Sequence, residues 1–187
     1  MDMLRQQVRP ESRIGTWIIN GGTASNVIPA TGELEVTVRH TERDYLNGLS
    51  EQIKKIFEGA ALCTGTTVDV EFYGNPYDDM NQNHRGTHLI EDVMTDMGLD
   101  FEPGPADIGG SSDIGNVSYQ CAAFHPKLRL AGPDKVCHAK EFADAMLERT
   151  IEATIVDGAN IIGSTLLRLV ENPTVLEEIV AEFNATK

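Results

Sequence analysis

The stretch RIGTWIINGGTASNVIPATGELEVTVR, residues 13–39, places a glycine-rich polar island between two apolar segments. Ile14, Trp17 and the isoleucines after it predict a first strand over residues 13–20. In residues 33–39, leucine and valine alternate with polar residues, which predicts a second strand with one buried and one solvent-facing side. Pro29 interrupts any regular ladder within the island. The stretch therefore predicts two strands joined by a long polar loop.

The residues that follow predict a helix and a further strand. Apolar side chains recur at helical spacing from Tyr45 to Ala60, and Gly65 lies in the turn that follows. Thr41-Glu42-Arg43-Asp44 resembles a capping box in which aspartate takes the last position. Residues 67–73 alternate between apolar and acidic side chains, which predicts another strand. We therefore expect an antiparallel sheet with helices on one face.

The pattern changes after residues 74–79, where glycine, asparagine and proline cluster. We place a domain boundary here, with one domain over residues 1–75 and a second over 76–187. The second domain is expected to be mainly helical with two short strands. The expected helices cover residues 87–97, 141–170 and 175–183, and the expected strands cover residues 117–121 and 128–131.

Composition limits the partners. The chain has 187 residues and a net charge of −14, which argues against binding nucleic acid or an anionic membrane. The three cysteines show no metal-binding or disulfide spacing. The first ten residues lack the apolar core of a signal peptide, and no stretch is expected to span a membrane. These features predict a cytoplasmic protein.

A second glycine-rich island, residues 109–118, contains Gly110, Ser111 and Ser112. Its backbone N–H groups and small hydroxyls are suited to binding an oxyanion or carboxylate. It lacks the Gly-Lys-Ser/Thr of a phosphate-binding P-loop. The alternative is an ordinary glycine–serine turn.

Three further residues are candidates for a site. His138 stands just before a predicted helix and has the chemistry of a metal ligand, although one ligand alone does not make a site. Its alternative is an exposed or capping histidine. Arg39, at the end of the second strand, has the forked geometry that binds carboxylates, or else is an ordinary surface arginine. Asn26 lies in the loop before that strand.

Together these segments resemble one family of dinuclear zinc amidohydrolases. The family includes aminoacylase, carboxypeptidase G, hippurate hydrolase and aminobenzoyl-glutamate hydrolase, and the similarity is greatest to its branch of dipeptidases. The resemblance is carried by motifs in the same order and spacing along the chain. They are Asn20-Gly21-Gly22-Thr23-Ala24, Asn26-Val27-Ile28-Pro29, Val38-Arg39, residues 110–118, Phe124-His125-Pro126, His138 and Glu141-Phe142.

The resemblance implies a fold of the α/β class with two domains. The first would be a ferredoxin-like α+β lid that mediates dimerisation. The second would be the C-terminal part of a zinc-exopeptidase-like α/β/α catalytic domain. By the same resemblance, Asn26, Arg39 and the loop of Gly110, Ser111 and Ser112 contact a small amide or dipeptide substrate. His138 would ligate one of two zinc ions.

The chain also departs from the family pattern. The other metal ligands and the general base belong to an N-terminal half that these residues do not contain, and the lid lacks its first strand and most of its first helix. We therefore identify no catalytic residue and expect the chain alone to bind zinc weakly at most. Two alternatives remain open: a non-catalytic dimerisation or binding module, and one half of a split enzyme.

Overall fold

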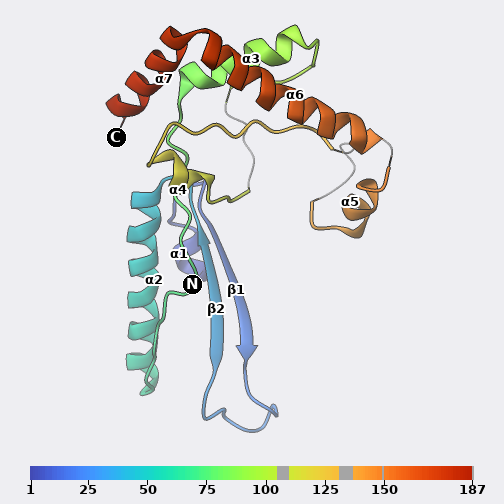
Figure 1. Cartoon of the computed structure of the whole chain (residues 1–187). Coiled ribbons are helices and arrows are strands. Elements are labelled where there is room, and N and C mark those ends of the chain that lie inside the picture. Colours follow the sequence, from blue (N-terminus) through green and yellow to red (C-terminus); the bar gives the residue numbers. More distant parts are fainter. Residues whose placement is uncertain (105–109, 131–136, 149, 187) are drawn as a thin grey trace. The chain divides into compact units, whose positions relative to one another are not determined.

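The computed structural model describes residues 1–104, 110–130, 137–148 and 150–186. The chain divides into two compact units, Met1–Asp79 and Met80–Lys187, which we call the N-terminal unit and the C-terminal unit. The N-terminal unit contains a two-stranded sheet, and the described part of the C-terminal unit contains helices only (Figure 1). This mixture is compatible with the expected α/β class.

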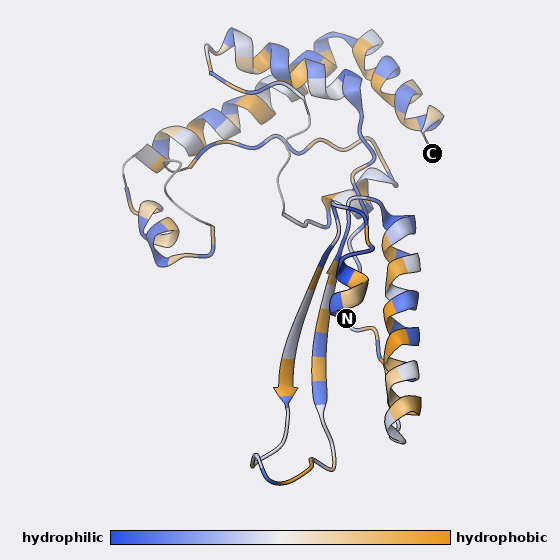
Figure 2. Ribbon diagram, turned by 180° about the vertical axis from the view of Figure 1, so that it is seen from behind, coloured by the Kyte–Doolittle hydropathy of each residue, from blue (hydrophilic) through white to orange (hydrophobic). Residues whose placement is uncertain are grey.

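The N-terminal unit is a β-hairpin covered on one face by helices. Strands β1 (Arg13–Asn20) and β2 (Glu33–Arg39) pair antiparallel, as the alternating pattern predicted. Helices α1 (Asp2–Arg5) and α2 (Arg43–Thr64) cover the face that carries the even-numbered β2 residues. Figure 2 shows the apolar residues along α2 and the hairpin. The core of this unit comprises Leu4, Leu49 and Ile53, with half-buried Ile14, Val36 and Val38 packed against them.

Helix α2 matches the predicted helix but begins differently. The predicted capping box does not form, because the N-cap residue is Glu42 and its side chain makes no cap hydrogen bond. Instead, the Arg43 N–H donates to Asp79 Oδ1 at 3.1 Å, so a residue far along the chain satisfies this end. At the other end Gly65 adopts a left-handed conformation, with φ of 68°, that only glycine adopts readily.

The strand predicted over residues 67–73 is not formed. These residues are extended and mostly exposed, but they pair with no strand in the described chain. An alternating pattern creates a strand only where a neighbouring strand supplies hydrogen-bonding partners. The prediction was wrong because the sequence pattern does not show whether that neighbour is present.

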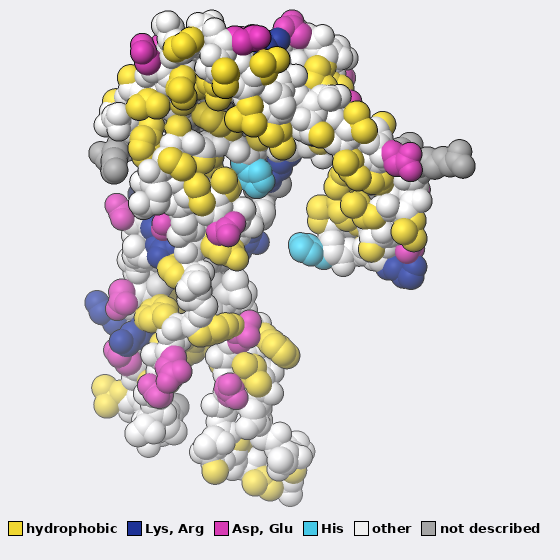
Figure 3. Space-filling view, viewed as in Figure 1, with side chains coloured by type: hydrophobic (Ala, Val, Ile, Leu, Met, Phe, Trp, Pro, Cys, Tyr) yellow, Lys and Arg dark blue, Asp and Glu magenta, His cyan; other side chains and the backbone are white. Residues whose placement is uncertain are grey.

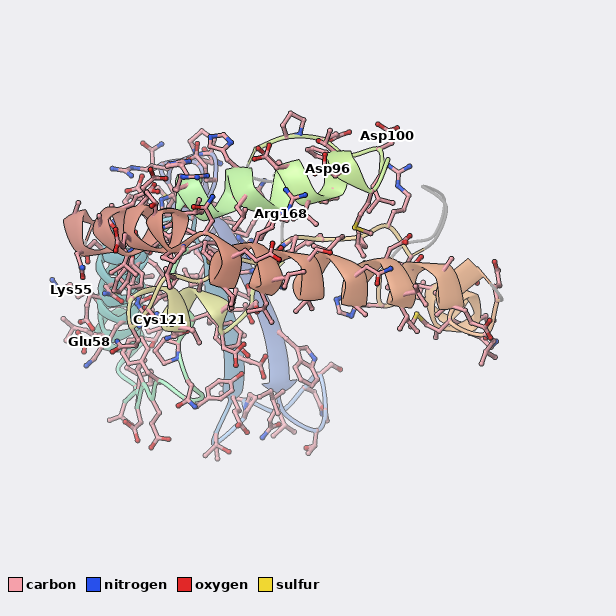
Figure 4. All side chains as sticks on the ribbon, turned by 45° about the horizontal axis from the view of Figure 1, so that its top comes forward. Lys55, Glu58, Asp96, Asp100, Cys121 and Arg168 are labelled. Atoms are coloured by element: carbon pink, nitrogen blue, oxygen red, sulfur yellow. The ribbon has the colours of Figure 1, made fainter. Side chains whose placement is uncertain are left out.

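The C-terminal unit is built on three longer helices: α3 (His84–Asp96), α6 (Thr150–Glu171) and α7 (Pro173–Ala185). Two short helices, α4 (Ile114–Ser118) and α5 (Lys140–Ala145), lie between α3 and α6. The buried cluster joins α3 to α6 and also contacts Phe124 and Leu128. It consists of Ile90, Val93, Met94 and Ile161. Arg168 of α6 and Asp96 of α3 form an ion pair between the same two helices (Figure 4).

The predicted helices of this unit are confirmed, and its predicted strands are corrected. Residues 141–170, which were expected to be mostly helical, form two helices, α5 and α6. Residues 117–121 form the end of α4 and a turn rather than a strand, and residues 128–130 form no ladder; residue 131 lies outside the described residues. As with residues 67–73, neither segment pairs with β1 or β2, the two strands of the described sheet.

Helix α3 depends on α7 for its N-terminus. Asn83 accepts a hydrogen bond from the Gly86 N–H, and its own amide donates to the Ile179 carbonyl at 2.9 Å. Glu182 of α7 accepts the N–H groups of His84 and Arg85, each at 2.8 Å. Partial burial raises the pKa of Glu182, but these N–H groups and nearby histidines outweigh it, and the pKa lies below its ordinary value.

This contact predicts acid sensitivity. Because the folded-state pKa is lowered, the Glu182 contribution is present above the ordinary glutamate pKa of about 4.3 and is lost as pH falls through the folded value. We expect Glu182→Gln to lower the urea midpoint of the C-terminal unit at pH 6 and to lower it by less at pH 3. Glu177→Gln on the same helix is the control. An equal deficit for Glu182→Gln at both pH values would contradict the capping role.

Candidate functional site

The loop of Gly110, Ser111 and Ser112 leads directly into α4. Gly110 and Ser111 are exposed, and Ser112 is half-buried. The Ser112 hydroxyl accepts a long hydrogen bond, 3.4 Å, from the Ile114 N–H. Gly109 lies outside the described residues. The loop is therefore held at its helix end, while Gly110 and Ser111 are exposed to solvent.

A buried serine fixes the position of α4. Ser118 is fully buried, donates its hydroxyl to the Gly115 carbonyl at 2.6 Å and accepts the Asn81 N–H at 2.8 Å. The Asn81 amide also reaches Thr186 Oγ1 at 3.1 Å, just beyond α7. This network connects the candidate loop to both ends of the C-terminal unit. The pattern of the sequence did not identify Ser118, because its strand prediction for these residues was wrong.

His138 has an unusual backbone conformation. Its φ is 69°, and it is the only residue other than glycine with a positive φ among those described. A histidine reaches this left-handed region only at some cost in energy, and such residues cluster at functional sites. The side chain is exposed, and Ala139 after it is the N-cap of α5. The sequence identified His138 as a candidate, but its pattern did not predict the left-handed conformation.

The described residues do not by themselves make a zinc site. Nowhere in the described ranges do three or more His, Cys, Asp or Glu side chains gather as metal ligands would. Cys137, beside His138, is exposed. Three or four protein ligands are the rule for bound zinc. The donor set therefore does not fit the ion without further ligands.

Asn26 and Arg39 lie apart within the N-terminal unit. Asn26 is exposed in the loop between β1 and β2, and Arg39 is exposed at the opposite end of β2. The length of β2, about 20 Å, separates the loop from Arg39. The two residues therefore do not form one contact site within one copy of the chain.

The face of the hairpin away from α2 carries a small polar cluster. Arg39 shares this face with Glu35, since alternate residues of a strand point the same way. Trp17, opposite Glu35 in the register, is 64% exposed. A hydrogen bond from the Tyr73 hydroxyl to the Glu35 carboxylate raises the pKa of Tyr73 above its ordinary value. The sequence pattern did not indicate the contact between Glu35 and Tyr73, because it predicted a strand over residues 67–73.

A pocket of about 340 Å³ in the C-terminal unit lies elsewhere. Its lining contains none of the predicted site residues and mixes two arginines with two carboxylates. The lining residues are Arg85, Leu89, Asp92, Arg168, Glu171, Asn172 and Val175. Arg85 already pairs with Glu178, and Arg168 pairs with Asp96. The pocket therefore offers no excess charge for a ligand.

Comparison with known proteins identifies the relatives. The chain is 29% identical to a mouse Xaa-Arg dipeptidase over 98% of its own length. It is related to the amidohydrolase family named above. The human Xaa-Arg dipeptidase is 26% identical over 98% of the chain, and an N-acetyldiaminopimelate deacetylase of Leuconostoc citreum is 32% identical over 48%. No family model matches the chain.

The match covers only part of each relative. The chain spans 43% of the mouse dipeptidase and 42% of the human one, less than half of either. This partial coverage fits the C-terminal part of an amidohydrolase, as the motifs predicted. More than half of each dipeptidase therefore has no counterpart in these residues.

Proposed function

We propose that this chain is the C-terminal part of a metal-dependent amidohydrolase or dipeptidase and acts when the remaining part of such an enzyme is present. The observation that carries this proposal is the match of 98% of the chain to a dipeptidase. The relatives are named for cleaving a dipeptide, an N-acetyl group and an aminobenzoyl-glutamate conjugate. Each name describes hydrolysis of an amide bond, so we propose this reaction for the completed protein.

The proposed roles follow the chemistry of the side chains. His138 would give one imidazole ligand to a metal site, in a protein that binds two zinc ions when complete. Its left-handed backbone supports this role, because strained residues persist where a function requires them. Gly110, Ser111 and Ser112 would bind the substrate through N–H groups and hydroxyls, and Arg39 would bind a carboxylate. Asn26 would contact a substrate that is bound to another copy of the chain, since Asn26 and Arg39 of one copy are too far apart to hold the same substrate.

A dimerisation module is the second candidate. It is favoured by the large apolar side chains that the hairpin leaves exposed, including Trp17, Ile18 and Ile28, which is 94% exposed. Both outer edges of the hairpin lack partners in the described chain. Exposed edges and apolar faces promote association. We propose that the N-terminal unit forms a homodimer in the cytoplasm, with or without catalysis.

The isolated chain should be inactive. We expect less than one equivalent of zinc after dialysis, because a single imidazole leaves most coordination positions to water. Hydrolysis of Xaa-Arg dipeptides and N-acetyl amino acids should not exceed the buffer rate. Elemental analysis and an amine-release assay provide the two measurements. Stoichiometric zinc in the isolated chain would show that our assignment of a single ligand is wrong.

A further inference from the structure

Helix α6 carries large apolar side chains on the side that faces solvent. Six of them are between 56% and 78% exposed. They are Ile155, Val156, Ile162, Leu166, Leu167 and Val170. At 100° per residue these positions, with Ala159 and Gly163, lie within an arc of about 140°. We call this arc the α6 outer face, and Figure 3 shows apolar side chains gathered on the C-terminal unit.

The opposite side of α6 is the more polar one. Ile161 enters the buried cluster, but Thr165 beside it is buried, and its hydroxyl has no hydrogen-bond partner in the described structure. Arg168 on the same side pairs with Asp96. A soluble helix normally points its apolar stripe inward. The apolar stripe of α6 faces outward instead. This arrangement indicates that a partner outside the described structure covers the α6 outer face.

A membrane is a poor partner for this face. Residues Ile151–Glu171 are long and apolar enough to cross a membrane, with a mean hydropathy of 1.2. This finding corrects the expectation that no stretch would be able to span one. However, spanning would remove Ile161 from its packing with Ile90 and Val93. Helices that lie on membranes are rich in lysine and arginine, whereas acidic Glu152, Asp157 and Glu171 outnumber the single Arg168 on α6.

The missing part of the relatives is a better partner. The match joins 98% of the chain to 43% of the mouse dipeptidase. The matched region therefore includes α6, and more than half of the dipeptidase lies outside it. The six large side chains of the outer face, each more than half exposed, form one contiguous apolar patch, and such patches mark interaction sites.

We propose that the α6 outer face is the surface on which the rest of a full-length dipeptidase packs, whether that polypeptide is joined to this chain or separate. The identity of the partner rests on the proposed function, but the interaction itself does not require hydrolysis. The pairing of Ile161 and Arg168 with α3 holds α6 in the C-terminal unit, so the outer face is available before the partner binds.

Co-purification tests this proposal. The probe is the mouse Xaa-Arg dipeptidase from which the region matched by this chain has been removed, co-expressed with the tagged chain. We expect an equimolar complex with the unchanged chain and at least a tenfold loss of recovered partner with Ile162→Lys/Leu166→Lys. The matched control is Leu62→Lys, because Leu62 is 83% exposed on α2 in the other unit. Circular dichroism should show equal helix content in all three proteins.

Several outcomes would overturn the proposal. The first is the absence of any complex with the unchanged chain. The second is recovery of equal amounts of the partner with the unchanged chain and with the double variant. Self-association of the unchanged chain that the double variant abolishes, without any effect on the partner, would assign the face to a second copy. Flotation with phosphatidylcholine–phosphatidylserine vesicles that depends on the same residues would assign it to lipid. A complex that forms as expected but hydrolyses nothing would contradict the proposed function and leave this interface intact.

Discussion

Replacing His138 with alanine is expected to lower kcat/KM for amide hydrolysis by more than about 100-fold in the completed protein. Loss of partners that merely orient metal ligands already costs 10–100-fold, so loss of a ligand should cost at least as much. The completed protein is the chain co-expressed with, or fused to, the remaining part of a dipeptidase. Metal content should fall together with turnover, which elemental analysis of the same samples would show.

The backbone of His138 allows a test of the alternative role. If the residue matters only for its left-handed conformation, His138→Asn and His138→Gly should preserve activity, because both residues adopt that region readily. If it is a metal ligand, both variants should be as inactive as His138→Ala. Arg39→Ala should differ from all three by chiefly raising KM. Full activity of His138→Gly would show that His138 is not a metal ligand.

Gly86→Ala should destabilise the C-terminal unit by about 1–3 kcal/mol or more, the cost of inserting a group into a packed core. Gly86 is buried in the first turn of α3, and the Phe124 ring lies against it. An added methyl carbon would stand 1.8 Å from Phe124 Cε1 and 2.2 Å from Cζ. The ring must leave its place in the buried cluster to accommodate the methyl group. Urea denaturation followed by circular dichroism measures the effect.

Gly163→Ala is the matched control for this substitution. Gly163 also lies within a helix, but nothing stands within 4 Å of the position that its added methyl carbon would take. There the gain in helix propensity should prevail, and we expect a stabilisation of up to about 1 kcal/mol. Equal effects of the two substitutions would contradict the described packing of Phe124 on α3.

The sequence predicted elements whose determinants are local. Apolar spacing predicted α2 and α3, and alternation predicted β1 and β2. Gly65, which caps the end of α2, and Gly98, which follows the Met97 C-cap of α3, both take the left-handed conformation that favours glycine after a helix. These features depend on neighbours within a few residues, so the pattern contains the information that determines them.

Elements that depend on distant partners were not predicted. Residues 67–73 have a strand pattern but no paired strand, and the first N–H groups of α2 and α3 donate hydrogen bonds to Asp79 and Glu182, far along the chain. The candidate site behaves in the same way. Local motifs identified His138 and the Gly110–Ser112 loop, but no local pattern could show the left-handed φ of His138 or the role of Ser118.

The most direct test of the central claim compares the chain alone, the remaining part of a dipeptidase alone, and the two together. For each sample, bound metal and release of arginine from an Xaa-Arg dipeptide would be measured. We predict metal binding and chelator-sensitive hydrolysis only when both parts are present, both lost with His138→Ala. Hydrolysis by the chain alone, or a stable complex that binds no metal, would contradict the account.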